Sequence, residues 1–301
     1  MSIAPLLANG PLVTDGGLET DLLFHHGFDL PEFAAFPLLE DRAGRAALNA
    51  YYDQYAAIAR AAGQGLLLEP PTWRANPDWA VRIGYDSSAL DRANREAVAF
   101  VRSAQERAGV DRTLIVGLQG PRGDGYVTGT RPDQDEAAEY HAVQARCFAA
   151  EGTDLVHAMT ITTPEEAIGV VRAARSTGLP VAVSFTVETD GRLPDGTPLG
   201  TAVERVDAVA SPDWFGINCA HPTHIAPAFD AGTWQERIGG VRPNASTLTH
   251  DELDAMEVLD EGNLELLTSS FERLRPHLPN LMVVGGCCGT DARHVASLWG
   301  V

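Results

Sequence analysis

Residues 155–187, LVHAMTITTPEEAIGVVRAARSTGLPVAVSFTV, read as a strand, a helix and a second strand in immediate succession. Apolar and β-branched runs at 155–162 and 180–187 predict the two strands, and the stretch 164–177 between them predicts the helix. A unit of this kind joins parallel strands through a right-handed crossover. This segment therefore predicts a parallel sheet covered by helices.

The same alternation extends along the whole chain. Strand-like runs lie near 11–17, 65–72, 113–120, 155–162, 180–187, 214–220, 238–245 and 281–288. Helix-like stretches lie between them at 42–63, 86–108, 133–151, 164–177 and 200–210. Eight strand–helix units in 301 residues predict an α/β fold, a (β/α)₈ barrel formed by residues 1–301 as a single domain. A doubly wound sheet is the alternative.

The composition narrows the chemistry that the chain can perform. Its 41 acidic residues outnumber its 22 basic ones, and a net charge of −19 opposes binding to nucleic acid and to anionic membranes. Every basic residue is an arginine, so mechanisms that need a lysine amine are excluded. The absence of a signal-like N-terminus and of a long apolar window predicts a cytoplasmic protein. The composition is compatible with assembly into a homo-oligomer.

Polar side chains and cysteines gather at the carboxyl ends of the predicted strands, which is the face where barrel enzymes bind substrates. These positions are Asp15, Glu69, Gln119, Thr160, Glu188, Cys219, Asn244, Cys287 and Cys288. Closure of the barrel brings the ends of the sixth and eighth strands close together, so three cysteines are expected to meet there. The fourth, Cys147, lies within a predicted helix, where we expect it to pack in the core.

Three cysteines at neighbouring strand ends predict a metal site. Consecutive strand residues point to opposite faces, so Cys287 and Cys288 can share an ion with Cys219 only where the backbone turns sharply. The glycines in GGCCG, residues 285–289, permit that turn. Three thiolates suit Zn²⁺, and an open fourth position is typical of a catalytic site. Buried cysteines and a vicinal disulfide are the alternatives.

The number of protein ligands decides what such an ion can do. A fourth ligand from His221 or His224 would make the site structural, and the chain would then be a non-catalytic zinc-binding barrel. An ion held by three thiolates alone is a poor Lewis acid, but it suits a substrate thiol, which it helps to deprotonate. A sulfur activated in this way can attack a methyl group on a positively charged donor. The expected reaction class is therefore S-alkyl transfer.

Four motifs carry a resemblance that spans nearly the whole chain. They are DGGLET at 15–20, DGTPL at 195–199, GINC at 216–219 and GGCCGT at 285–290. With these motifs the chain resembles the zinc-dependent homocysteine S-methyltransferase family, which includes betaine- and S-methylmethionine-dependent enzymes. The resemblance implies a (β/α)₈ barrel, Zn²⁺ bound by Cys219, Cys287 and Cys288, and methyl transfer to homocysteine, which gives methionine.

The resemblance also implies an acceptor pocket, with one departure from the family pattern. Asp15 matches the aspartate that lies near the amino group of homocysteine, and this implies that it orients the acceptor. Family members usually carry Phe-Glu-Thr at the end of the fourth strand, whereas this chain has Met159 in place of the glutamate. Glu69 and Glu188 are candidates to supply the missing charge. A different thiol or a selenol is therefore the alternative acceptor.

A donor pocket is predicted from aromatic residues in the loops. Trp73 and Trp79 follow the second strand and Tyr126 follows the third, and aromatic faces bind sulfonium and quaternary ammonium groups. Packing within the loop is the alternative role for the two tryptophans. Gln119 is also expected to contact substrate, and Asn244 is the candidate for binding the substrate carboxylate. Both partners, the thiol acceptor and the cationic methyl donor, are expected to be small molecules.

Overall fold

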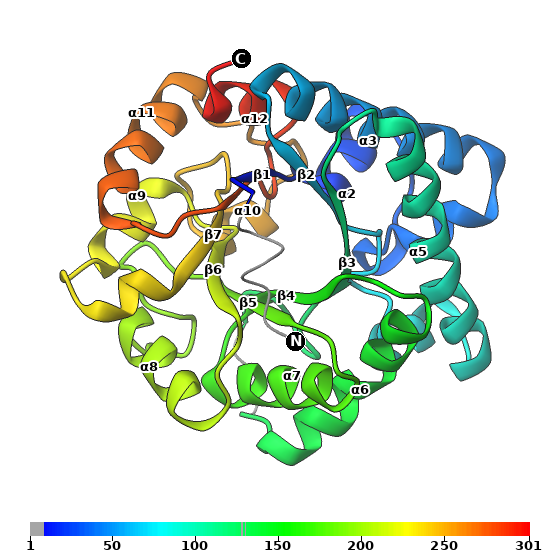
Figure 1. Ribbon diagram of the computed structural model, residues 1–301, viewed down its shortest axis with the longest axis horizontal. Helices are drawn as coiled ribbons and strands as arrows, with labels where there is room; N and C mark the ends of the chain where they lie inside the picture. Colours follow the sequence, from blue (N-terminus) through cyan, green and yellow to red (C-terminus); the bar gives the residue numbers. More distant parts are fainter. Residues whose placement is uncertain (1–8, 128, 130) are drawn as a thin grey trace.

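The computed structural model describes residues 9–127, 129 and 131–301, and these form a closed barrel of eight parallel strands (Figure 1). The strands pair in chain order, and the last pairs with the first. They are β1 (Leu12–Val13), β2 (Gly65–Leu68), β3 (Thr113–Gln119), β4 (Leu155–Ile161), β5 (Val181–Phe185), β6 (Trp214–Asn218), β7 (Ile238–Arg242) and β8 (Val283–Val284). The predicted (β/α)₈ fold is confirmed, and the doubly wound alternative is excluded.

Helices surround the barrel as an outer ring (Figure 1). The longer ones are α3 (Arg42–Ala62), α5 (Ser87–Ala108), α6 (Gln134–Ala150), α7 (Pro164–Ser176), α8 (Leu199–Val209), α11 (Leu264–Leu274) and α12 (Ala292–Trp299). Short helices lie in the connections that follow the strands, and they are α2 (Leu18–Thr20), α4 (Pro77–Ala80), α9 (Pro222–Ile225) and α10 (His250–Asp254). The five predicted helices agree with the observed bounds to within one residue at each end.

Capping residues explain where these helices begin and end. The Asp41 side chain accepts hydrogen bonds from the first backbone amides of α3, and Gly63 ends that helix with a left-handed φ of 62°. In α7, Thr163 is the N-cap and Pro164 follows at the first helical position. No helix in the described part of the chain is long and apolar enough to cross a membrane.

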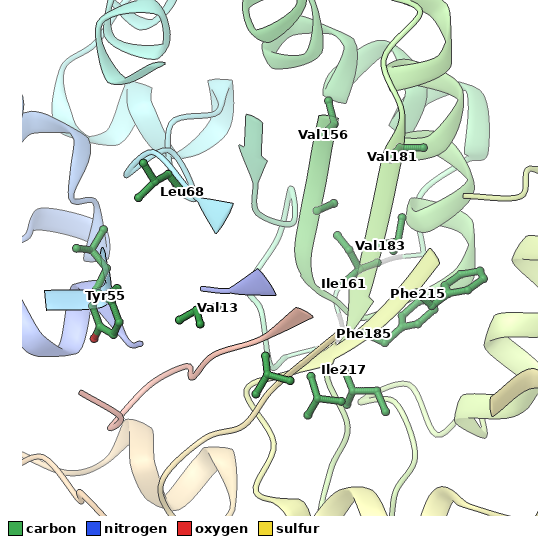
Figure 2. Close-up of a cluster of buried hydrophobic side chains, with 14 of the residues drawn as sticks. Val13, Tyr55, Leu68, Val156, Ile161, Val181, Val183, Phe185, Phe215 and Ile217 are labelled. Carbon is green, nitrogen blue, oxygen red and sulfur yellow. The ribbon is translucent and has the colours of Figure 1, made fainter. Parts of the chain in front are cut away.

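The core has two layers because strand side chains alternate between the two faces of the sheet. One layer packs between strands and helices, and Figure 2 shows part of it, including Val13, Val156, Val181 and Val183. The other layer contains buried residues of the strands alone and fills the barrel interior. Its members are Leu12, Leu67, Leu114, Val116, Leu155, Ala182, Trp214 and Val283. The alternation decides which strand-end residues point into the barrel mouth.

The shortest strands, β1 and β8, pair over two residues each, which is shorter than the predicted runs at 11–17 and 281–288. The residues that follow them leave the ladder and bond to each other. Gly286 donates its amide to the carbonyl of Asp15 at 2.7 Å, and Gly17 donates to that of Thr290 at 2.9 Å. The DGG and GGCCGT motifs therefore form one connected turn structure at the seam of the barrel.

Candidate metal centre and active site

The three cysteines predicted to meet are brought together. Cys219 directly follows β6, and Cys287 and Cys288 lie just beyond β8. Their sulfur atoms all lie within 4.8 Å of one another, with Cys219 buried and the other two partly exposed. All are free thiols, so the structure contains no vicinal disulfide between Cys287 and Cys288. This arrangement allows a single ion to contact all three sulfurs.

A sharp turn lets two consecutive cysteines face the same point, as expected from the flanking glycines. Thr290 closes the turn, because its backbone amide and its hydroxyl both donate to the carbonyl of Cys287, at 3.0 and 2.7 Å. A Cβ on Gly286 would lie 2.0 Å from the Thr290 hydroxyl, and Gly289 adopts a φ of 75°. Both glycines are therefore required by the shape of the turn.

Two non-glycine residues beside this turn adopt left-handed backbone conformations. Cys219 has a φ of 55° and Thr160 a φ of 62°, a region that is costly for β-branched residues. Asn218 holds Thr160 in place, because its side-chain oxygen accepts from the Thr160 amide at 2.8 Å and its Nδ2 donates to the Thr160 hydroxyl at 2.9 Å. The backbone at the end of β4 is thus tied to the residue that precedes Cys219.

Hydrogen-bond donors surround the sulfur atoms. The Tyr126 hydroxyl lies 2.9 Å from the sulfur of Cys219, and Asn244 Nδ2 lies 3.6 Å from the same sulfur. Hydrogen bonds from the other two thiols lower the pKa of Cys219 well below its usual value, and burial raises the pKa of Tyr126. This environment favours a thiolate at Cys219 and a neutral, hydrogen-bonding phenol at Tyr126.

The two histidines considered as a fourth ligand lie outside the cluster. Among the described residues, the cysteines are the only group of three or more side chains with metal-ligand spacing. His221 uses Nδ1 to cap α9 through Thr223, and His224 pairs its Nε2 with the carbonyl of Thr247 at 3.1 Å. The structure therefore gives no support to a site closed by histidine.

A buried ion cluster lies beside the cysteines, and its centre is Arg242 at the end of β7. The guanidinium donates to carboxylate oxygens of both Asp15 and Glu69, and its Nε donates to the Gly286 carbonyl at 2.8 Å. It also contacts the sulfur of Met159 at 3.5 Å. Burial raises the pKa of Asp15 and the charge of Arg242 opposes that rise. Two carboxylates of the barrel mouth thus share one cation.

Two cavities flank the cysteines. The inner pocket, of about 40 Å³, lies against the strand ends and is lined by residues that include Asp15, Glu69, Met159, Arg242, Cys287 and Cys288. The outer pocket, of about 410 Å³, is formed mainly by loops, and its lining includes Trp73, Arg74, Trp79, Tyr126, Asn244 and Cys288. Cys288 lines both pockets, so molecules bound in them meet at the thiol cluster.

Comparison with known proteins places this arrangement in a family. The family model described as homocysteine S-methyltransferase matches residues 12–299. The chain belongs to the homocysteine S-methyltransferase family. This confirms the resemblance drawn from the four motifs, and with it the predicted enzyme class, methyltransferase.

Relatives of known structure share the fold of this family member. The crystal structure of the homocysteine methyltransferase MmuM from Escherichia coli, metallated form, superimposes with a TM-score of 0.76 at 19% identity and covers 99% of both chains. The oxidized form of MmuM superimposes with a TM-score of 0.72 at 20% identity. That match covers 96% of this chain and 95% of the MmuM chain. At these identities the likeness shows the fold.

A curated relative in sequence is the S-methylmethionine–homocysteine S-methyltransferase BHMT2 of Mus musculus, which is 25% identical. The match covers 55% of this chain and 49% of the mouse protein. The matched region thus spans about half the length of that relative.

Two residues predicted to contact substrate lie outside both pockets of this homocysteine S-methyltransferase family member. Gln119 points outward and donates to the backbone of His141 in α6 at 2.9 Å, because its neighbour Leu118 takes the inward position. Glu188 accepts a hydrogen bond from Nδ1 of His250 at 2.9 Å, and Nε2 of His250 donates to the carbonyl of Cys219 at 2.8 Å. Of the two candidate carboxylates, Glu69 is the one that lines the inner pocket with Met159.

The predicted aromatic faces hold an arginine of the chain itself. The guanidinium carbon of Arg74 lies 4.1 Å from the ring centre of Trp73 and 3.7 Å from that of Trp79. Arg74 therefore occupies a face of each tryptophan, and both rings line the outer pocket, so their role in binding a donor cation stays a prediction. The side-chain amide of Asn244 points at the sulfur of Cys219, and its role in binding the substrate carboxylate stays a prediction.

Sequence reasoning missed two arginines at this site, Arg242 and Arg74. A signal for the first was present, because Arg242 is the only arginine within the eight strand-like runs. An arginine in a buried parallel strand requires carboxylate partners. Arg74 lies in a loop, where sequence gave no comparable signal.

Proposed function

We propose that this protein is a zinc-dependent S-methyltransferase that moves a methyl group from a sulfonium or quaternary ammonium donor to a thiol, homocysteine in the first instance. The observation that carries the proposal is the cluster of Cys219, Cys287 and Cys288 at the meeting point of two pockets. Family membership and the activities named for the mouse and Escherichia coli relatives support it. The product from homocysteine is methionine.

The donor set at the cluster fits zinc. Three soft sulfur ligands within 4.8 Å of one another suit Zn²⁺, which binds thiolates at about 2.3 Å. The described residues add no fourth ligand, so a position stays available to a substrate sulfur. Zinc held by Cys219, Cys287 and Cys288 would favour the thiolate form of an acceptor bound at that position, and the thiolate is the nucleophilic form.

The chain's own residues orient this chemistry. The acceptor sulfur forms a bond to the donor methyl carbon while the bond from that carbon to the donor's sulfur or nitrogen breaks. The electron pair of the broken bond stays with the leaving group, which becomes a neutral sulfide or amine, and the thiol proton has already gone to solvent. Tyr126 and Asn244 hold the ligand sulfur of Cys219 by hydrogen bonds. Asp15 is proposed to orient the acceptor from the inner pocket.

One observation favours a second candidate acceptor, a thiol or selenol without a free amine. Asp15, which the family resemblance assigns to the substrate amine, already accepts a hydrogen bond from Arg242. Met159 adds no charge, and Glu69 is paired with the same guanidinium. An ammonium group that binds Asp15 or Glu69 in the inner pocket must therefore compete with a buried arginine.

A matrix of donors against acceptors, run with metal analysis on the same preparation, tests the proposal. Sulfonium and quaternary ammonium donors are each paired with homocysteine and with mercaptopropionate, which lacks the amine. We expect about one zinc per chain and methyl transfer that stops when a chelator removes the metal. Full activity after exhaustive chelation contradicts the proposal. Preference for mercaptopropionate selects the second acceptor.

A further inference from the structure

Arg74 is a buried cation without an ionic partner among the residues that the structure describes. Its side chain is only 6% exposed, yet none of the ion pairs among the described residues includes it. One hydrogen bond is found, from Nη1 to the carbonyl of Gly123 at 3.2 Å, and the buried Nε has no acceptor in the described part of the chain. A buried charged group of this kind is costly unless a ligand completes its hydrogen bonds.

The surroundings of Arg74 hold it in place without satisfying its charge. The guanidinium lies over the rings of Trp73 and Trp79, and these cation–π contacts hold it in place. The carboxylate of Asp124 is a nearby negative charge, but it is exposed and accepts from the amides of Tyr126 and Val127 at 2.8 and 3.0 Å. The free edge of the guanidinium is therefore preorganised for a group that comes from outside the chain.

The position of Arg74 indicates which substrate carries that group. Arg74 lines the outer pocket but not the inner pocket, whereas Tyr126 and Cys288 line both. The inner pocket contains Asp15 and is assigned to the acceptor in the proposed function. The larger outer pocket is left for the donor. It also contains the carboxylates of Asp254 and Asp260, which favour a cationic centre in the same cavity.

We propose that Arg74 is a specificity-determining residue that binds a carboxylate of the methyl donor. The Nε–H of an arginine and the adjacent Nη form the edge on which a carboxylate binds through two parallel hydrogen bonds. S-methylmethionine, which carries a sulfonium centre and a carboxylate, is a donor with which this role of Arg74 can be tested. This inference rests on the proposed function, in which the outer pocket receives the donor.

The experiment compares donors that differ only in this group, S-methylmethionine and its methyl ester, in wild type, Arg74→Gln and Arg74→Lys. We expect Arg74→Gln to raise KM for the acid by about 10- to 100-fold, with kcat little changed and KM for the ester within about twofold of wild type. Arg74→Lys, which keeps the charge but loses the fork, should lie between the two. The matched control is Arg82→Gln, because Arg82 also stacks on Trp79 but is 55% exposed and paired with Glu32.

Calorimetric titration of the donor into the enzyme separates this inference from the proposed function. Lower affinity of Arg74→Gln for the acid, with unchanged affinity for the ester, supports the role of Arg74 whether or not methyl transfer is observed. Equal affinity of wild type and Arg74→Gln for the acid overturns it. A change in KM for the acceptor in place of the donor also overturns it. Absence of methyl transfer from every donor to every acceptor overturns the proposed function instead.

Discussion

Arg242 and Arg74 are both buried at the mouth of the barrel, but among the described residues only Arg242 forms ion pairs with carboxylates. Arg242 is paired with Asp15 and Glu69 and also donates to a backbone carbonyl. Arg74 contacts the rings of Trp73 and Trp79 and, in the described part of the chain, has a single backbone acceptor. The first arginine helps to build the inner pocket, whereas the second is left to interact with a ligand. A count of buried charges alone would not distinguish them.

The largest effect is expected at the thiol cluster. This cluster lies between the inner pocket, which Arg242 lines, and the outer pocket, which Arg74 lines. We expect Cys219→Ser to lose both the metal and detectable methyl transfer, because two thiolates are too few to retain the ion. Cys147→Ser is the matched control, since Cys147 lies in α6 and bonds Asp91 at 2.9 Å, away from the cluster. Metal analysis and activity on the same samples check both variants. An active Cys219→Ser enzyme would show that the two pockets do not serve a common metal site.

The comparison between the arginines is tested directly by stability. Arg242→Leu leaves Asp15 and Glu69 buried without their cation, so we expect it to lower the free energy of unfolding by about 3–5 kcal/mol. Arg74→Leu removes cation–π contacts and one hydrogen bond but no ion pair found among the described residues, and we expect it to cost less than Arg242→Leu. Urea denaturation of both variants gives the two values. Equal losses would break the distinction drawn between the two arginines.

A smaller effect is expected at Met159, which contacts the Arg242 guanidinium. Met159→Glu places a carboxylate in the inner pocket, where it can receive a substrate amine through a charge-assisted hydrogen bond. We expect the ratio of activity on homocysteine to activity on mercaptopropionate to rise by about tenfold. Met159→Gln controls for size and polarity without the charge. A fall in the ratio would mean that Glu69 already provides the carboxylate and that the added charge repels it.

The smallest expected effect is the release of a proton when the thiol acceptor binds. Binding of a thiol acceptor at the metal should release about one proton per site near neutral pH, because the bound form is a thiolate. Calorimetry in buffers of different ionisation enthalpy gives this number, and the Cys219→Ser protein is the control. The donor alone should release no proton, because it carries no thiol. Zero release by the acceptor would place its sulfur away from the metal and would break the assignment of the two pockets.

Much of the fold was readable from local sequence, because each strand and helix carries its own pattern. The runs at 155–162 and 180–187 became β4 and β5, and the helix between them became α7. The approach of Cys219 to Cys287 and Cys288 followed from chain order once eight parallel strands were predicted to close. No side-chain detail was needed for that step.

Side-chain direction and loop packing were harder to predict. Gln119 points away from the pocket because alternation along β3 gives the inward place to Leu118, a consequence that depends on the phase of the strand. Glu188 lies three residues beyond the end of β5, where no alternation applies. The contact of Arg74 with two tryptophans depends on the conformation of a loop, and local patterns do not determine it.

The pairing of β8 with β1 also bears on how the site comes into being. On the ribosome, residues 12–13 are made first and residues 283–284 are made after the other seven strands, so the ring cannot close until nearly all of the barrel has been synthesised. Cys287 and Cys288 lie three and four residues beyond the end of β8. Cys219 therefore emerges well before its two partners. Barrel closure and completion of the thiol cluster are in this sense one event, and a nascent chain that stops short of β8 contains neither.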